Sequence, residues 1–272
     1  MSGGRSQGVM LMNPDLELTF LGTGTSVGVP MIGCDCEVCH SADPRDHRDR
    51  SSIFLRTPEA AWVVDTGPDF RHQCLREKIR HLDAVLITHA HTDHIMGFDD
   101  LRRFTFGEEV TMPVHATAAT LAALQQAFAF AFDGTNRYLG YFKPDPRPIS
   151  GPFWIGETEV FPLPVLHGKV DTVGFLFSRA GRKRLAYIPD VKIIPESTMA
   201  LLQGVETLVV DCLRHRPIHT HFIVEESLAA AAAVGATRTY FTHLCHELGH
   251  AAFEATLPPG IQVAYDGLRV NI

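Results

Sequence analysis

The chain has 272 residues, of which 45% are hydrophobic and 20% are charged, and its net charge is −7. This composition can bury a sizeable core, and the negative balance argues against a dedicated nucleic-acid binder, which would carry a basic face. No stretch approaches the roughly 20 apolar residues of a membrane-spanning helix, and the N-terminus lacks the pattern of a signal peptide. We therefore expect a cytoplasmic protein.

Short apolar runs alternate with helical patterns along the chain. Runs rich in Val, Ile, Leu and aromatic residues that stop at Asp, His or Gly predict strands at 16–22, 51–56, 60–67, 82–89, 175–179, 184–190, 207–212, 238–243 and 262–267. Helical patterns occur at 69–80, 118–132, 195–202 and 224–234, and Pro and Gly at 144–152 predict a surface loop. We interpret the chain as a flexible tail at 1–14 followed by one α/β domain at 15–272.

The segment THAHTDH at 88–94 carries the strongest signal for chemistry, because it follows a predicted strand and holds four potential metal ligands. In extended backbone, His89 and His91 project to the same side of the chain. Asp93 and His94 follow where the chain turns into a helix, and they can face a second ion. Imidazole and carboxylate ligands suit Zn²⁺, Mn²⁺ or Fe²⁺. Other predicted strands also end in potential ligands, namely Asp190, Asp211 and His243.

The pattern T-H-x-H-x-D-H resembles the signature motif of the metallo-β-lactamase superfamily, and the later motifs of that family follow in order. The resemblance implies a four-layer αββα sandwich with two divalent ions, Zn²⁺ or Mn²⁺. It assigns His89, His91 and His167 to one ion. It assigns Asp93, His94 and His243 to the other ion, and it places Asp190 as a bridge between the two ions. Asp93 is also expected to act in catalysis.

Such a pair of ions, about 3.5–4 Å apart, can deprotonate a shared water and polarise a phosphoryl oxygen. The expected nucleophile is then a metal-bridging hydroxide, and no Ser or Cys nucleophile is required. Asp65, Gly67 and Asp266 resemble family positions that support the metal loops.

Three cysteines crowd into the segment CDCEVC at 34–39. Cys34, Cys36 and Cys39 have the spacing of zinc ligands rather than of a disulfide framework, and a closed Cys₃His site would be structural. The candidates for the fourth ligand are His246, His40 and Cys245. We favour His246, because it stands three residues after His243 and could tie the two sites together.

The pattern C-x-C-x₂-C with a late H-x-x-H resembles, within the superfamily, the cyclic phosphodiesterase of the carbon–phosphorus lyase pathway (PhnP-like), which acts in phosphonate metabolism. The resemblance implies hydrolysis of a small cyclic phosphate such as 5-phosphoribosyl 1,2-cyclic phosphate. It also implies that His246 completes the structural zinc site, and it suggests a homodimer.

A general acid must protonate the leaving oxygen, and His is the usual group near neutral pH. By the same resemblance His221 takes this role, although His219 is an alternative. Arg214 and Arg216 either steady the phosphate or are solvated loop charges.

The expected partner is a small phosphodiester, with no nucleic acid or membrane. The rival hypotheses are a protein of the pyrroloquinoline-quinone biosynthesis type and a hydrolase of RNA or of another ester. A binding protein that uses zinc only for stability is a further alternative.

Overall fold

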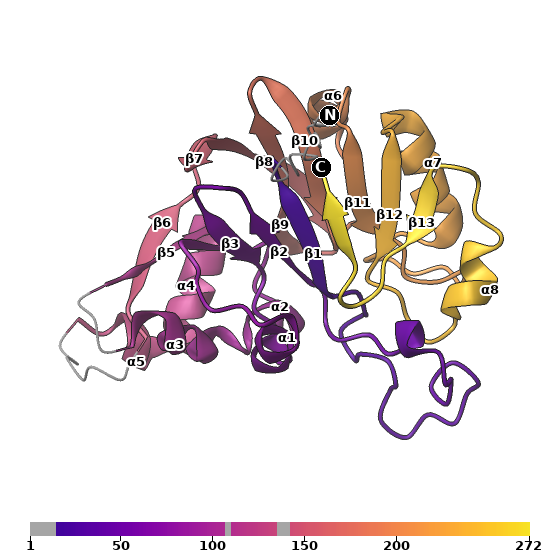
Figure 1. The fold of residues 1–272 in the computed structure, drawn as a ribbon, viewed down its shortest axis with the longest axis horizontal. Helices are drawn as coiled ribbons and strands as arrows, with labels where there is room; N and C mark the ends of the chain where they lie inside the picture. The colour runs from indigo at the N-terminus through magenta and orange to yellow at the C-terminus, as the bar shows by residue number, and fades with distance from the viewer. Residues whose placement is uncertain (1–14, 107–109, 135–141) are drawn as a thin grey trace, which may run out of the picture.

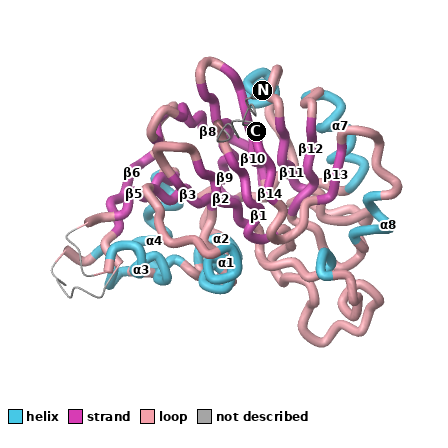
Figure 2. The backbone as a smooth tube through the Cα atoms, in the orientation of Figure 1, coloured by secondary structure: helices cyan, strands magenta, loops and turns pink. Residues whose placement is uncertain are grey.

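The computed structural model describes residues 15–106, 110–134 and 142–272, so the predicted tail at 1–14 lies outside the described residues. Two mixed sheets lie face to face in the middle of the molecule, and helices cover their outer faces (Figures 1 and 2). This is the predicted αββα sandwich. None of the helices that the structure describes has the length and apolar character needed to span a lipid bilayer.

The first sheet is built mainly from the N-terminal half of the chain. Its strand order is β14-β1-β2-β3-β4-β5-β6. β1 pairs antiparallel with both β2 and β14, whereas β3, β4, β5 and β6 run parallel. The bounds are β1 Glu17–Gly22, β2 Ser52–Arg56, β3 Ala61–Val64, β4 Ala84–Leu86, β5 Met112–Ala116, β6 Pro144–Pro148 and β14 Arg269–Asn271.

The second sheet is built from the C-terminal half. Its order is β13-β12-β11-β10-β9-β8-β7, and β10 to β13 run parallel. Because the carboxyl ends of parallel strands meet at one edge, the residues that follow β10, β11 and β12 lie near one another. The bounds are β7 Phe153–Ile155, β8 Thr158–His167, β9 Val170–Arg179, β10 Arg182–Ile188, β11 Thr207–Asp211, β12 Arg238–Thr242 and β13 Ile261–Val263.

The helices fall into two groups. Those from the N-terminal half lie beside the first sheet, and α6, α7 and α8 lie beside the second (Figure 1). The α-helices are α1 Phe70–Glu77, α2 Thr92–Ile95, α3 Arg102–Thr105, α4 Ala118–Ala127, α5 Ala129–Phe132, α6 Glu196–Leu202, α7 Val224–Val234 and α8 His250–Glu254, and the 3₁₀ turns are η1 Pro44–Asp46 and η2 Phe98–Leu101.

Three hydrophobic clusters separate the four layers. In β3, Trp62 and Val64 belong to the cluster between the sheets, whereas Ala61 and Val63 belong to the cluster under α1 and α4. The third cluster joins β10, β11 and β12 to α6, α7 and α8. A strand buried on both faces needs apolar residues at every position, which explains the continuous run AWVV.

The prediction of a loop at 144–152 was wrong over its first half, where β6 forms the edge of the first sheet. Proline is tolerated on an edge strand when its missing N–H faces away from the neighbouring strand. Prolines at 144, 146 and 148 share one side of β6, while the N–H of Ile149, on the other side, donates to Ala116. The helix predicted at 118–132 is interrupted at Phe128, where φ is −122°.

Candidate metal centre

Both sheets contribute side chains to one cluster of His and Asp residues. The segment after β4 supplies His89, His91, Asp93 and His94, and the last two lie in α2. The second sheet supplies the other three from the ends of β8, β10 and β12: His167, Asp190 and His243. The cluster therefore forms where the two halves of the chain meet.

The first group of side chains is compact. His89 Nε2 lies 2.9 Å from His91 Nδ1, and His167 Nε2 lies 3.2 Å from the same His91 nitrogen. Asp190 Oδ2 lies 3.6 Å from His167 Nε2, and one ligand atom of each of these four residues lies within 4.8 Å of the others. Burial lowers the pKa of His89 well below its usual value, and burial also lowers that of His91 and His167. Burial thus favours the neutral form of these rings, which is the form that binds a metal.

The second group lies directly beside the first. His94 Nε2 lies 3.3 Å from Asp93 Oδ2, and His243 Nε2 lies 3.7 Å from the same oxygen. All three side chains are buried. His243 has a φ of +61°, an unusual conformation for a residue other than glycine. Such backbone conformations concentrate at functional sites, where the surroundings hold them in place.

Asp190 lies between the two groups. Its Oδ1 is 3.2 Å from His94 Nε2, and its Oδ2 is 3.5 Å from His243 Nε2. Burial raises the pKa of Asp190, but His243 and His94 more than offset this, so the pKa lies well below its usual value. A buried carboxylate with this environment requires positive charge beside it.

Unpaired atoms test whether the cluster suits metal ions. Among the described residues, Asp190 Oδ1, His94 Nε2 and both ring nitrogens of His243 are buried and have no hydrogen-bond partner. Buried polar atoms without partners are rare, and coordination of a metal ion would satisfy them. The donor set of imidazoles and carboxylates suits Zn²⁺ or Mn²⁺. The side chains therefore fit the predicted partition of ligands between two ions, with Asp190 shared.

Hydrogen bonds behind the cluster orient its rings. Asp65 Oδ2 lies 2.8 Å from His94 Nδ1, and Asp65 also accepts from the N–H and the hydroxyl of Thr88. His167 Nδ1 lies 2.7 Å from the carbonyl oxygen of Thr220, so this nitrogen carries the proton and Nε2 faces the cluster. Such contacts fix the tautomer of a ligating histidine. The sequence singled out Asp65 but carried no signal for the Thr220 carbonyl.

Gly67 lies against the segment that carries Asp93. A Cβ added there would lie 2.1 Å from the carbonyl oxygen of Asp93, so the backbone would have to move. We expect Gly67→Ala to lower the free energy of unfolding by about 1–3 kcal/mol or more, as overpacking does, and to weaken metal binding. Urea denaturation measures the first effect. Gly151→Ala, which has open space around the added Cβ, is the control, and equal stability of the two variants would contradict the prediction.

His221, rather than His219, lies at the cluster. Its Nδ1 is 2.9 Å from Asp211 Oδ2, and its ring lies 4.6 Å from that of His167 and 4.7 Å from that of His243, centroid to centroid. His219 is exposed. Burial lowers the pKa of His221, and the opposing effects of Asp190 and Asp93 do not cancel it, so the protonated ring is a stronger acid than usual.

The sequence indicated Asp211 as a potential ligand at a strand end, but it did not predict the role that the structure gives this residue. Its Oδ2 accepts hydrogen bonds from the N–H groups of Val191 and Phe222 as well as facing His221. It thereby holds the loops after β10 and β11 together and orients the His221 ring. The signal that the sequence offered was an Asp at the end of an apolar strand with a His ten residues later. The structure adds that Asp211 is fully buried.

Arg214 and Arg216 are both engaged with Glu247. Arg216 Nε donates to Glu247 Oε1 at 3.0 Å, and Arg214 Nη1 lies 3.9 Å from the same oxygen. The Arg216 side chain is 72% exposed. These contacts favour the interpretation of solvated loop charges for Arg216, whereas Arg214 lies near enough to His221 to lower its pKa.

The three cysteines of the early loop gather around His246. Its Nδ1 lies 3.1 Å from Cys34 Sγ, 3.4 Å from Cys36 Sγ and 3.7 Å from Cys39 Sγ. Of the three candidates for a fourth ligand, only His246 joins this group within the described residues. A hydrogen bond from the N–H of Cys39 lowers the pKa of the Cys36 thiol to about 6, whereas burial raises the pKa of the Cys39 thiol to about 11. Cys36 is therefore the cysteine of this pair that loses its proton more readily. Thiolate is the form that binds zinc.

We expect Cys36→Ser to lose about one zinc ion per chain and to lower Tm by at least about 5 °C. The reason is that a four-ligand zinc site contributes to folding, and each 1 kcal/mol shifts Tm of a chain of this size by about 2–4 °C. Elemental analysis and thermal unfolding measure the two effects. Cys74→Ser, in a half-buried thiol of α1 outside the group, is the control. Unchanged zinc content in Cys36→Ser would rule out the structural site.

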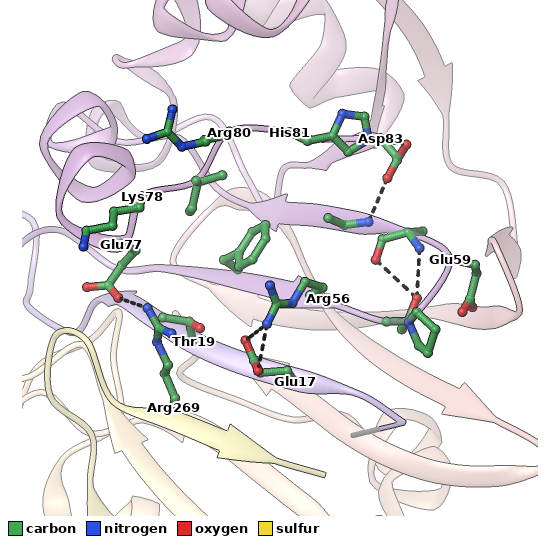
Figure 3. Close-up of a pocket in the computed structure, with 16 residues that line it drawn as sticks. Glu17, Thr19, Arg56, Glu59, Glu77, Lys78, Arg80, His81, Asp83 and Arg269 are labelled. Carbon is green, nitrogen blue, oxygen red and sulfur yellow. Dashed lines mark hydrogen bonds and ion pairs between the residues drawn. The ribbon is translucent and has the colours of Figure 1, made fainter. Parts of the chain in front are cut away.

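Two surface pockets lie away from both clusters. One has a volume of about 420 Å³, and the other, of about 1060 Å³, lies between α1 and β5. In the smaller pocket, Arg56 pairs with Glu17 and Arg269 pairs with Glu77, so two of its cations are already neutralised (Figure 3). None of the His, Asp or Cys side chains of the two clusters lines either pocket.

Comparison with known protein families shows one match that covers most of the site. The beta-lactamase superfamily domain matches residues 62–244. A solved diphosphatase from the PhnP family is 37% identical, with a TM-score of 0.87, and the match covers 94% of this chain and 98% of that one. Zn²⁺-bound PqqB from Methylobacterium extorquens shares the fold, with a TM-score of 0.75, 23% identity, and coverage of 94% and 100%.

Among curated proteins, an octanoyltransferase of Porphyromonas gingivalis is 34% identical over 262 residues, which is 93% of this chain and 51% of the relative. The chain thus spans about half the length of that relative. Coenzyme PQQ synthesis protein B of Methylorubrum populi is 28% identical over 225 residues, 72% of each chain.

The matched segment begins in β3 and ends just after β12, so it contains all seven side chains of the His and Asp cluster. The fold and the solved PhnP-family structure agree with this match along almost the whole chain. The fold of this family implies divalent metal ions. The chain belongs to the metallo-β-lactamase superfamily, as a PhnP-like metal-dependent hydrolase.

Proposed function

We propose that the chain is a phosphodiesterase that uses two divalent ions, Zn²⁺ or Mn²⁺, and that residues 15–272 act as one catalytic domain. The observation that carries the proposal is the pair of adjacent ligand groups that share Asp190. An open site for two ions has little structural use, which argues against a binding protein that uses zinc only for stability.

The ions, when bound, would activate water and neutralise charge on a phosphoryl group. His89, His91 and His167 would hold one ion, and Asp93, His94 and His243 the other. Asp65 and the Thr220 carbonyl keep two of these rings in the tautomer that presents Nε2.

His221 is the proposed proton donor to the leaving oxygen. Its ring lies beside both ligand groups, and only 13% of its side chain is exposed. Asp211, which faces Nδ1, holds the ring so that Nε2 remains available to the leaving oxygen. Arg214 adds positive charge near this point, which would favour an anionic substrate.

The proposed substrate is a small cyclic phosphate such as 5-phosphoribosyl 1,2-cyclic phosphate. Similarity to a PhnP-family diphosphatase supports chemistry at phosphorus. The net charge of −7 is unfavourable for a long polyanion such as RNA. Similarity to PQQ synthesis protein B supports the alternative that the chain acts in a biosynthesis of that type.

The test is ³¹P NMR of 5-phosphoribosyl 1,2-cyclic phosphate incubated with protein reconstituted in Zn²⁺ or Mn²⁺. We expect conversion to one monophosphate, and none with a metal-free sample. If the cyclic phosphate is not converted but bis-nitrophenyl phosphate is hydrolysed, the proposed substrate is wrong and the proposed phosphodiesterase reaction still holds. No activity on either compound would contradict the phosphodiesterase proposal.

A diphosphate is the second candidate substrate, because the solved relative at 37% identity is a diphosphatase. The same ligand groups could act on a phosphoanhydride, whose better leaving group needs less help from a general acid. Hydrolysis of a nucleoside diphosphate derivative, followed by the same NMR measurement, distinguishes the two candidates.

A further inference from the structure

One short segment reaches both clusters. His243, directly after β12, belongs to the His and Asp cluster, and His246 belongs to the group of cysteines. Three residues span at most about 10 Å, so the two clusters are near neighbours through this backbone. A displacement of residues 243–248 would therefore move a ligand of each.

Backbone hydrogen bonds fix the start of this segment. The N–H of Leu244 donates to Thr23 at 2.9 Å, and the carbonyl of Leu244 accepts from Thr25 at 3.2 Å. The N–H of Cys245 donates to Leu213 at 3.0 Å. The end of the segment makes no such backbone hydrogen bond to another part of the chain within the described residues, and a side chain holds it instead.

That side chain belongs to Arg48, which is completely buried. Its Nη1 donates to the carbonyl of Cys245 at 3.0 Å, and its Nη2 donates to the carbonyl of Leu248 at 2.6 Å. Asp46 lies 3.2 Å from the same Nη2 and balances the charge. One planar guanidinium thus spans both sides of His246, which a Lys ammonium could not do in the same geometry.

Arg48 is also fixed to the loop that carries the cysteines. Its N–H and carbonyl exchange hydrogen bonds with Val29 at 2.7 and 2.9 Å, just before that loop. Gly24, after β1, packs so tightly on Arg48 that an added Cβ would lie 2.7 Å from the Arg48 carbonyl oxygen. The loop (purple in Figure 1) lies beside the yellow segment before α8, where Asp46 accepts from the N–H of His250. Arg48 therefore links the cysteine loop to residues 243–248, and Asp46, which balances the charge of Arg48, contacts the residue at the start of α8.

We propose that residues 243–248 couple the two clusters, with Arg48 as the positioning residue, so that metal bound at either cluster raises the affinity of the other. Binding at the cysteines orders His246 and with it His243, and binding at His243 orders the same segment in return. Thermodynamic linkage makes this effect equal in both directions. The inference rests on the proposed occupancy of both clusters by metal.

The first experiment uses the wild-type chain. Zn²⁺ is loaded at the cysteines, and the His and Asp cluster is either stripped or filled with Mn²⁺, which avoids thiolate ligands. A chelator that prefers Zn²⁺ is then titrated into both samples, with Mn²⁺ in excess in the filled sample only, and retained zinc is measured by elemental mass spectrometry. We expect zinc to be held about 5- to 150-fold more tightly when the other cluster is filled, the range typical of coupled sites.

Three variants test whether the coupling depends on the segment and on Arg48. Arg48→Lys keeps the charge but cannot bridge the two carbonyls. We therefore expect the ratio of the two zinc affinities, measured with the His and Asp cluster filled and stripped, to fall towards one. Arg45→Lys is the matched control, because the Arg45 side chain pairs with Asp43, and it should keep the wild-type ratio. Cys36→Ser, which leaves all seven His and Asp ligands in place, should weaken Mn²⁺ binding by the same factor.

The outcomes separate this inference from the proposed function. Absence of metal from the His and Asp cluster of the wild type would contradict the proposed function, whereas absence of zinc from the cysteines alone would contradict the coupling. Two occupied clusters with independent affinities would contradict the coupling alone. A wild-type ratio of zinc affinities in Arg48→Lys would leave the coupling in place and would overturn the role of Arg48. If Arg48→Lys does not fold, the wild-type ratio and the Mn²⁺ affinity of Cys36→Ser still decide whether the coupling exists.

Discussion

Asp190→Ala should lower kcat/KM by roughly 10³-fold or more. Asp190 is the side chain that faces both ligand groups, and metal-assisted charge stabilisation is worth several kcal/mol, with a factor of ten for each 1.36 kcal/mol. Removal of the carboxylate would also remove the negative charge that offsets the two proposed ions. We therefore expect the metal content to fall together with the activity.

Steady-state kinetics and elemental analysis of the same samples test this prediction. Asp145→Ala, in an exposed ion pair with Arg147 on β6, is the matched control for loss of a carboxylate and should keep both metal and activity. Full activity in Asp190→Ala would exclude a site in which two ions share this residue.

His221→Ala should affect substrates according to their leaving groups. With an alkoxide leaving group the variant should lose about 10²- to 10⁴-fold in kcat, the usual contribution of a general acid. With a nitrophenolate leaving group, which departs without a proton, the loss should be small. His219→Ala, in an exposed histidine two residues earlier, should be close to wild type on both esters.

An equal loss on both esters would assign His221 a different role. One ligand atom of each of Asp190, His221 and His243 lies within 4.8 Å of the others, so His221 could instead bind an ion. In that case the metal content of His221→Ala would fall as well. Metal analysis therefore accompanies the kinetics.

The ligand groups were predictable because short-range patterns determine them. His89 and His91 alternate in extended backbone after a buried strand, and Asp93 and His94 fall on the first turn of α2. The more distant ligands came from the resemblance to a family, since nothing local distinguishes His167 from other histidines. The resemblance favoured His221, but no local pattern excluded His219, because both occupy the same kind of loop and packing against His167 is what separates them.

The features that were missed depend on contacts between distant segments. Arg48 and the Cys245 carbonyl are 197 residues apart, and no periodicity indicates that they meet. The edge strand β6 was hidden by its prolines, which usually mark loops. The four-layer fold itself was expected from the family motifs, and the buried strands on both sheets agree with it.

The pairing of β1 with β14 has a consequence for the order of the chain. Glu17 lies opposite Asn271, and the N–H of Ile272 donates to Leu16, so the two ends of the sandwich meet as the arms of a hairpin would. A short turn could join them, and new termini could be opened at the exposed tip between β9 and β10, where Gly181 has open space around it. Such a circular permutant would read Asp190 and His243 before His89 and still assemble the same cluster. The chemistry therefore requires the spatial arrangement of these residues and not their order along the chain.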